Sequence, residues 1–162
     1  MGKVTSVLFV GVGGQGVLKA SDVLARAAFL SGRDVKKSEI HGMSQRGGGV
    51  TSTVRFGEKV YSPLAPAGKT DFIVAFDVTE GEKYVPELAP GGHSFFIDDQ
   101  LLSRVYDRRF ASIALLGRLA EMLDFSDEIW EKSITLEVPE AHVSANIAAF
   151  RLGRQLKGLK GA

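Results

Sequence analysis

The sequence contains no cysteine among its 162 residues. Without thiols the chain cannot form a disulfide, use a cysteine nucleophile, or hold an iron–sulfur cluster through thiolates. Its three histidines, at positions 41, 93 and 142, are scattered and show none of the spacings of a zinc site. We therefore expect this chain to bind no metal ion and no covalently attached cofactor.

Several other patterns are missing as well. There is no G-x-S-x-G motif, and no Gly-Lys-Ser/Thr follows the glycine loop near the N-terminus, which excludes a nucleophile elbow and a P-loop. No apolar run approaches the ~20 residues that cross a bilayer, and residues 1–3 lead into a strand-like segment rather than a signal peptide. The net charge is +1, which gives no argument for nucleic-acid or membrane binding. We expect a cytoplasmic protein.

What is present is ordinary for a globular chain: 44% hydrophobic and 24% charged residues. This length is enough to bury a full core in one domain. The sequence shows no internal repeat, linker or low-complexity segment. We expect a single domain over residues 1–162.

The most informative stretch is VTSVLFVGVGGQG, at residues 4–16. Its first part is an apolar run of strand formers, its glycines follow G-x-G-x-x-G spacing, and an amphipathic helical pattern comes directly after it. Glycine allows the backbone to turn sharply and to approach a ligand, and the start of the helix favours an anion. The alternative is a tight turn that binds nothing. The candidate cofactor-binding residues are Gly11, Gly13, Gly14, Gln15 and Gly16.

A second glycine-rich stretch, HGMSQRGGGV, occupies residues 41–50 between two strand-like segments. Three consecutive glycines are costly to order, which suggests a backbone that must pass close to a ligand or partner. Arg46 is the best anion-binding candidate, because a guanidinium can fork onto a phosphate or carboxylate. We expect His41 to orient the loop rather than to act as a base. The alternative is a flexible hairpin loop. The candidate ligand or partner residues are His41, Ser44, Gln45, Arg46, Gly47 and Gly48.

The remaining pattern alternates strand-like and helical segments, which predicts a Rossmann-like three-layer α/β/α fold with a mostly parallel sheet. We expect residues 50–56 to form an added β-hairpin with residues 60–62 across a turn at 57–59. Thr79 and Glu82 fit a capping box at the start of a helix. The further strands are expected at 33–40, 71–76 and 94–97, and the further helices at 109–123, 127–132 and from Pro139 to about Leu156.

Three segments together resemble a known family. GVGGQGV at 11–17, KSEIHGMSQRGGGV at 37–50 and DFIVAFDVTEGEKYVPELAPGG at 71–92 are similar to the γ-type domain of the 2-oxoacid:ferredoxin oxidoreductases. The SEIHGMSQRGG form is closest to the β subunit of indolepyruvate ferredoxin oxidoreductase. The resemblance runs through the chain in order, although its last third is generic.

The resemblance implies a division of labour. Such enzymes oxidatively decarboxylate a 2-oxoacid to an acyl-CoA and pass electrons to ferredoxin. This chain lacks cysteine and lacks the G-D-G…N-N pattern that holds thiamine diphosphate and magnesium. We therefore expect thiamine diphosphate, Mg and the [4Fe–4S] clusters on a catalytic partner chain, no catalytic residue here, and no activity of the isolated chain. We expect one of the two glycine loops to hold a phosphate-bearing ligand, with CoA as the first candidate, or to contact the catalytic partner chain. When isolated, the chain is a candidate homodimer.

Three alternatives to this interpretation remain. The chain is somewhat shorter than typical indolepyruvate β subunits, which leaves room for a different 2-oxoacid. A stand-alone NAD-dependent oxidoreductase or dinucleotide-binding module would use the same glycine turn, although Tyr84 and Tyr106 lack a Y-x-x-x-K context. A pure interaction module would use the glycines only for tight turns.

Overall fold

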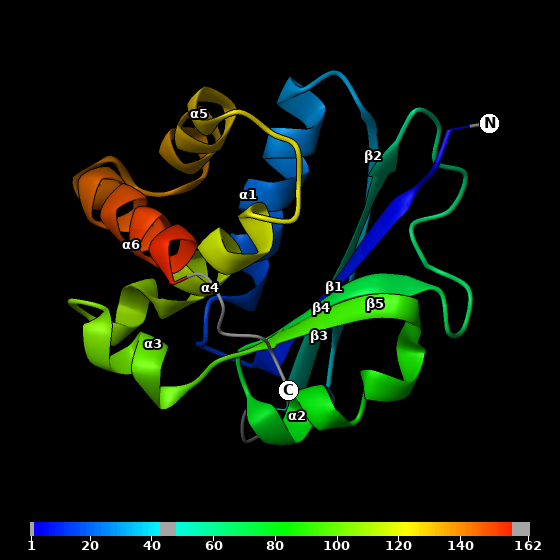
Figure 1. Cartoon of the computed structure of the whole chain (residues 1–162), viewed down its shortest axis with the longest axis horizontal. Coiled ribbons are helices and arrows are strands. Elements are labelled where there is room, and N and C mark those ends of the chain that lie inside the picture. Colours follow the sequence, from blue (N-terminus) through cyan, green and yellow to red (C-terminus); the bar gives the residue numbers. More distant parts are fainter. Residues whose placement is uncertain (1, 43–47, 157–162) are drawn as a thin grey trace.

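The computed structural model describes residues 2–42 and 48–156. Its centre is a five-stranded sheet with the order β2-β3-β1-β4-β5, so the first strand lies in the middle (Figure 1). The residues before the first glycine turn are almost entirely buried, as expected for an apolar central strand. The strands are β1 (Thr5–Val12), β2 (Asp34–His41), β3 (Gly49–Gly57), β4 (Thr70–Ala75) and β5 (Leu88–Phe96).

Strand direction confirms the α/β class and partly matches the expected parallel sheet. β1 pairs with β4, and β4 with β5, in parallel. β3 is antiparallel to both of its neighbours, β1 and β2. Four strands therefore run in one direction and β3 runs against them, so only half of the neighbouring pairs are parallel.

The expected hairpin between residues 50–56 and 60–62 is wrong. β3 instead forms its hairpin with β2, and its other side is taken by β1. Because both edges of β3 are already paired, residues 60–62 have no free backbone groups of β3 to pair with. Val60 is fully buried as a single side chain, and its backbone N–H donates to Asp34 Oδ2 at 2.8 Å. That hydrogen bond holds the irregular segment around Val60 against the first residue of β2.

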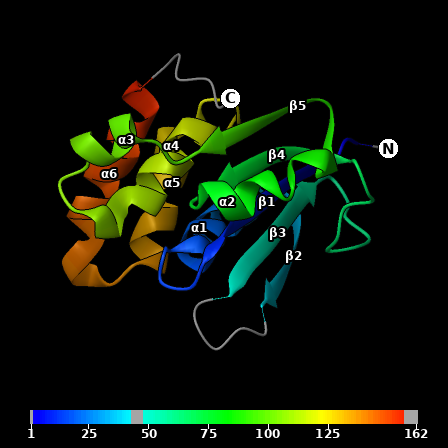
Figure 2. The same ribbon diagram turned by 90° about the horizontal axis from the view of Figure 1, so that it is seen from below.

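The helices cover the two faces of the sheet unequally. α1, α4, α5 and α6 form a thick layer on one face, whereas the short α2 lies on the other face over β1 and β4 (Figures 1 and 2). None of the helices in the described part of the chain has the length and apolar character needed to span a membrane. The helices are α1 (Val17–Leu30), α2 (Val78–Glu82), α3 (Asp99–Arg104), α4 (Ala111–Ala120), α5 (Asp127–Glu137) and α6 (Val143–Gln155).

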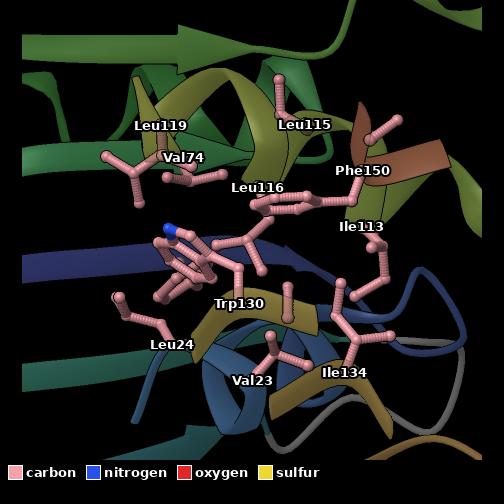
Figure 3. Close-up of a cluster of buried hydrophobic side chains, with 14 of the residues drawn as sticks. Val23, Leu24, Val74, Ile113, Leu115, Leu116, Leu119, Trp130, Ile134 and Phe150 are labelled. Atoms are coloured by element: carbon pink, nitrogen blue, oxygen red, sulfur yellow. The ribbon is translucent and has the colours of Figure 1, made fainter. Parts of the chain in front are cut away.

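The main core lies between the sheet and the thick helical layer (Figure 3). Trp130 of α5 is fully buried at its centre, with its ring 5.1 Å from that of Phe150 on α6 and 5.4 Å from that of Phe125. Side chains from β1, α1 and α4 complete the cluster. This packing fixes the starts of α1, α4 and α6 relative to one another, which matters for the site described next.

Candidate functional site

The turn between β1 and α1 is locked by one side chain. The backbone N–H of Val12 donates to Gln15 Oε1 at 2.7 Å, and the N–H of Gln15 donates to the carbonyl of Val12 at 3.3 Å. The amide oxygen of Gln15 is therefore used inside the turn. Of the predicted cofactor-binding residues, Gln15 thus has a clear role in shaping the loop.

Two of the glycines are required by packing and conformation. A Cβ on Gly11 would lie 2.6 Å from Val17 Cγ2, and a Cβ on Gly16 would lie 2.5 Å from the hydroxyl of Ser112 on α4. Gly16 also has φ 82°, a left-handed conformation that L side chains rarely adopt. Gly11 and Gly16 therefore bring the strand, the helix and α4 into close contact.

The other two glycines face open space. A Cβ on Gly13 or Gly14 would meet no atom within 4 Å, although Gly14 has φ 87° and so favours glycine on conformational grounds. α1 begins directly after this surface, with no side-chain cap at Gly16 and no acidic residue in its first turn. The first backbone N–H groups of α1 therefore have no side-chain acceptor at the cap, and no acidic side chain in the first turn offsets the positive end of the helix dipole, an arrangement that favours an anion.

A cavity of about 210 Å³ opens beside the start of α1. Ser112 lines it and is 4% exposed, yet its hydroxyl has no hydrogen-bond partner within residues 2–42 and 48–156. The described residues that line the cavity include three basic side chains and no acidic one. The hydroxyl is not among the enclosed, unsatisfied polar atoms of the described residues, so it is accessible from the cavity and can bond to a ligand there. The lining residues are Gly16, Lys19, Arg109, Phe110, Ser112, Ile113, Val138, Pro139, His142 and Asn146.

The basic side chains are held in different ways. Lys19 Nζ donates to the backbone carbonyl of Glu137 at 2.8 Å, so this ammonium keeps its charge without an acidic partner. Arg109 lies over the ring of Phe110 and forms an ion pair with Asp107 at 2.9 Å. The side-chain hydrogen bond from Arg109 holds the pKa of Asp107 below its ordinary value, so the carboxylate stays charged. Asp107 therefore positions Arg109 at the edge of the cavity.

The second glycine-rich loop leaves the sheet at the same edge as the first. Val12 is opposite Gly49 in the β1–β3 ladder, and His41 is opposite Val50 in the β2–β3 ladder. The backbone N–H of Gly42 donates to the carbonyl of Gly49 at 2.6 Å, the last contact between the two strands within the described residues of this hairpin. The two glycine-rich loops therefore lie at the same end of neighbouring strands.

Only part of the second candidate set can be placed. His41 is exposed at the end of β2, with its Nε2 4.0 Å from Glu39 Oε2, and Gly48 lies just before β3. Glu39 in turn accepts a hydrogen bond from Lys37. The predicted residues Ser44, Gln45, Arg46 and Gly47 lie outside the described residues.

Sequence reasoning missed the far wall of the cavity. Lys19, Arg109, Ser112 and His142 come from four separate helical segments and are separated by up to 123 positions in the chain. No local motif connects them. The G-x-G-x-x-G spacing shows that Gly16 must pack closely against something, but it does not identify Ser112 as the neighbour.

The comparisons with known proteins give one consistent result. Residues 6–101 match the family described as pyruvate ferredoxin/flavodoxin oxidoreductase. The indolepyruvate oxidoreductase subunit IorB of Thermococcus kodakarensis is 30% identical, and the alignment covers 91% of this chain and 93% of that protein.

Solved structures agree. The γ subunit of a keto/oxoacid ferredoxin oxidoreductase from Geobacter sulfurreducens has a TM-score of 0.73 at 26% identity, covering 93% of this chain and 96% of that one. Part of a 2-oxoglutarate:ferredoxin oxidoreductase from Magnetococcus marinus, with 2-oxoglutarate, coenzyme A and succinyl-CoA bound, has the same fold. Its TM-score is 0.80 at 20% identity, and the match covers 99% of this chain and 32% of that one.

Proposed function

The chain belongs to the pyruvate ferredoxin/flavodoxin oxidoreductase family, and we propose that it is the subunit without thiamine diphosphate and iron–sulfur clusters in a 2-oxoacid:ferredoxin oxidoreductase. The reaction of such an enzyme is the oxidative decarboxylation of a 2-oxoacid to an acyl-CoA. The likeness to an indolepyruvate oxidoreductase subunit over nearly the whole chain favours indolepyruvate or another aryl pyruvate as the substrate. The comparisons give no support to the alternative of a stand-alone NAD-dependent enzyme.

The part that this chain plays is to bind a phosphate-bearing ligand, CoA, at the start of α1. The observation that carries this proposal is the N-terminus of α1, which has no side-chain cap, beside a cavity that Ser112 lines with a hydroxyl free to bond to a ligand. Gly13 and Gly14 leave room for a ligand to approach the backbone. Lys19 and Arg109 supply positive charge around the same cavity, His142 adds an imidazole that can hydrogen-bond, and CoA carries several negative phosphates.

The electron-transfer chemistry belongs to a partner chain. The described residues contain no group of three or more His, Asp or Glu side chains arranged to hold a metal ion, and the whole sequence contains no thiolate ligand. These side chains do not fit a thiamine–magnesium site or an iron–sulfur cluster, so we derive no reaction step through either group on this chain. Its own residues bind and orient the anionic end of the ligand while the partner subunit performs the redox steps.

Isothermal titration of CoA into the full chain, alone and assembled with its catalytic subunit, tests the proposal. Ser112→Ala removes one hydroxyl without breaking any hydrogen bond in the described structure, and should weaken CoA binding about three- to tenfold. Ser103→Ala removes an exposed hydroxyl of α3 that lies outside the cavity and should leave the affinity unchanged. If wild-type protein in both forms shows no CoA binding, the glycine turn serves the docking of the catalytic subunit and the CoA role is wrong.

A further inference from the structure

β2 is an outer strand of the sheet and has an unpaired side. Within the described residues it pairs with β3 alone. Gly42 and Gly49 continue the β2–β3 register, and the hydrogen bond between them identifies the even-numbered residues of β2 as those bonded to β3. The backbone groups of Val35, Lys37, Glu39 and His41 therefore point away from the sheet, where another strand could pair with them.

Charge selects a register in which β2 could pair with itself. A two-fold axis perpendicular to the sheet can pass through one residue of β2, and that residue then lies opposite its own copy. An axis through Lys37 would place two ammonium groups together, and an axis through Glu39 would place two carboxylates together; both are unfavourable. An axis through Ser38 instead places Lys37 opposite Glu39 twice and uses the outward-pointing backbone groups.

Lys37 does not block this edge. An edge lysine discourages pairing when its charge extends into solvent. The side chain of Lys37 is only 19% exposed, because it turns onto Asp22 of α1, 2.6 Å away, and also bonds to Glu39. The strand therefore presents its backbone rather than a free charge.

Two exposed apolar side chains flank the same edge. Ile40 is 59% exposed on β2, and in this register it lies opposite the aliphatic stem of Lys36 from the other copy. Phe29 is 64% exposed and follows Asp22 on α1 by seven residues, or two helical turns, so it shares the face of α1 that overhangs β2. Pairing of the two β2 strands would bring Ile40 and Phe29 toward the second molecule.

From this edge we propose that the chain forms a homodimer through antiparallel pairing of β2 with β2 of a second copy, with the two-fold axis at Ser38. The two sheets join into one continuous ten-stranded sheet. No residue of β2 lines the cavity beside Ser112, and the inference does not depend on the proposed CoA role.

The absence of native cysteine makes the test direct. In this register Ser38 and its copy form a non-hydrogen-bonded pair, whose Cα atoms would be about 4.5 Å apart, within the ~4.4–6.8 Å that a disulfide accepts. Ser38→Cys should therefore give a covalent dimer on mild oxidation, reversed by reductant. Ser103→Cys, on the exposed surface of α3, is the control. The edge variant should cross-link at least about tenfold faster, because pairing raises the local thiol concentration.

Sedimentation of the wild-type chain and of Glu39→Lys provides the second measurement. The wild type should be a dimer, whereas Glu39→Lys places lysines opposite Lys37 and should be a monomer with an unchanged fold by circular dichroism. Equal cross-linking of the two cysteine variants, or a monomeric wild type, would overturn the proposal. The same cysteine can be tested in the assembled enzyme. If position 38 then cross-links to the catalytic subunit by disulfide exchange or through a maleimide, and no longer to its own copy, the edge of β2 contacts that subunit and the proposed homodimer is also wrong.

Discussion

Gly153 of α6 packs directly against the backbone carbonyl of Ala114 on α4. A Cβ on Gly153 would lie 1.7 Å from that oxygen. The same two helices make a second close contact, where a Cβ on Gly117 would lie 2.2 Å from the carbonyl oxygen of Phe150. The two helices therefore cross with their backbones in contact. This crossing places Ser112 near the start of α4 and His142 at the start of α6 on the same cavity.

Gly153→Ala should strongly destabilise the protein. Alanine has the higher helix propensity by about 1 kcal/mol, so an isolated helix would gain from the change. Here the added Cβ must displace backbone, and we expect a net loss of about 2–4 kcal/mol, the range of severe overpacking. Urea denaturation measures it. Ala148→Gly, at an exposed position of the same helix, should cost only about 1 kcal/mol, and equal effects of the two changes would contradict the close crossing.

Gly13 and Gly16 should respond to substitution in opposite ways. Gly16→Ala meets Ser112 and a left-handed backbone, so its melting temperature should fall clearly. Gly13→Val meets no atom at its Cβ, so the fold should be retained while the approach of a ligand or partner is obstructed. Thermal melting and CoA titration of both variants check this. If Gly13→Val only lowers the melting temperature and the reconstituted enzyme keeps full activity, Gly13 is a structural glycine.

The sequence predicted best where short-range chemistry decides the structure. The strand, turn and helix from β1 to α1 were expected from hydrophobic pattern and glycine spacing, and the structure confirms them. The start of α5 at residue 127 was also expected, and there Ser126 Oγ accepts the backbone N–H of Ile129 at 3.2 Å. In each case the deciding contacts lie within a few residues of one another.

Prediction failed where the deciding contact comes from elsewhere. Thr79 and Glu82 satisfy the spacing of a capping box, but α2 begins two residues earlier, where Asp77 accepts the N–H of Glu80 at 2.9 Å because β4 ends just before it. The pairing partner of β3 depends on which edges are free, and no local pattern records this. The cavity beside Gly16 has the same origin, since most of its wall comes from residues 109–146, far along the chain from the glycine turn.

The ion pair of Asp98 and Arg118 should make stability depend on pH. Arg118 is buried, with a side chain only 4% exposed, and its NH1 group donates to Asp98 Oδ2 at 2.9 Å. Burial opposes the charged carboxylate, but the hydrogen bond from Arg118 and the backbone N–H of Leu101 together lower the pKa of Asp98. A lowered acid pKa stabilises the fold at pH values above the unfolded pKa of about 3.9, and this contribution is lost as pH falls through the folded pKa.

Asp98→Asn isolates the charge, because asparagine can still cap α3. We expect a loss of about 1–2 kcal/mol at neutral pH, less than for a fully buried pair because the Asp98 side chain is 41% exposed. The variant should also lose less stability than the wild type between about pH 5 and pH 3. Urea denaturation across this interval measures both effects, and parallel pH profiles would mean that the pair contributes no net stability.

The isolated chain should show no oxidoreductase turnover with any 2-oxoacid. It contains no cysteine and no thiamine diphosphate signature, and its described residues form no metal-binding group. Viologen reduction by the pure single chain, with CoA and several 2-oxoacids, is the measurement. Turnover should appear only when the catalytic subunit is added; viologen reduction without it would refute the proposed division of labour.

The last prediction concerns Arg46, which lies outside the described residues and is argued from the sequence. Arg46 stands between Gln45 and three glycines in the loop that joins β2 to β3. The ends of that loop leave the sheet at the same edge as the start of α1. If both loops contact one anionic ligand, the guanidinium provides the directional contact and the glycines allow the backbone to approach. Losing such a charge-assisted pair costs ~1.5–3 kcal/mol, or roughly ten- to a hundredfold in affinity.

Arg46→Ala should therefore weaken the binding of CoA or of the catalytic subunit by that factor, with little change in melting temperature. Arg46→Lys should restore only part of the affinity, because an ammonium keeps the charge but cannot form the bidentate fork. Titration calorimetry of the wild type and both variants, against CoA and against the catalytic subunit, separates the two roles: the ligand whose affinity falls is the one that Arg46 contacts. Identical affinities of all three proteins for both ligands would make Arg46 a solvated surface charge and leave the three glycines of this loop to be explained by the path of the backbone alone.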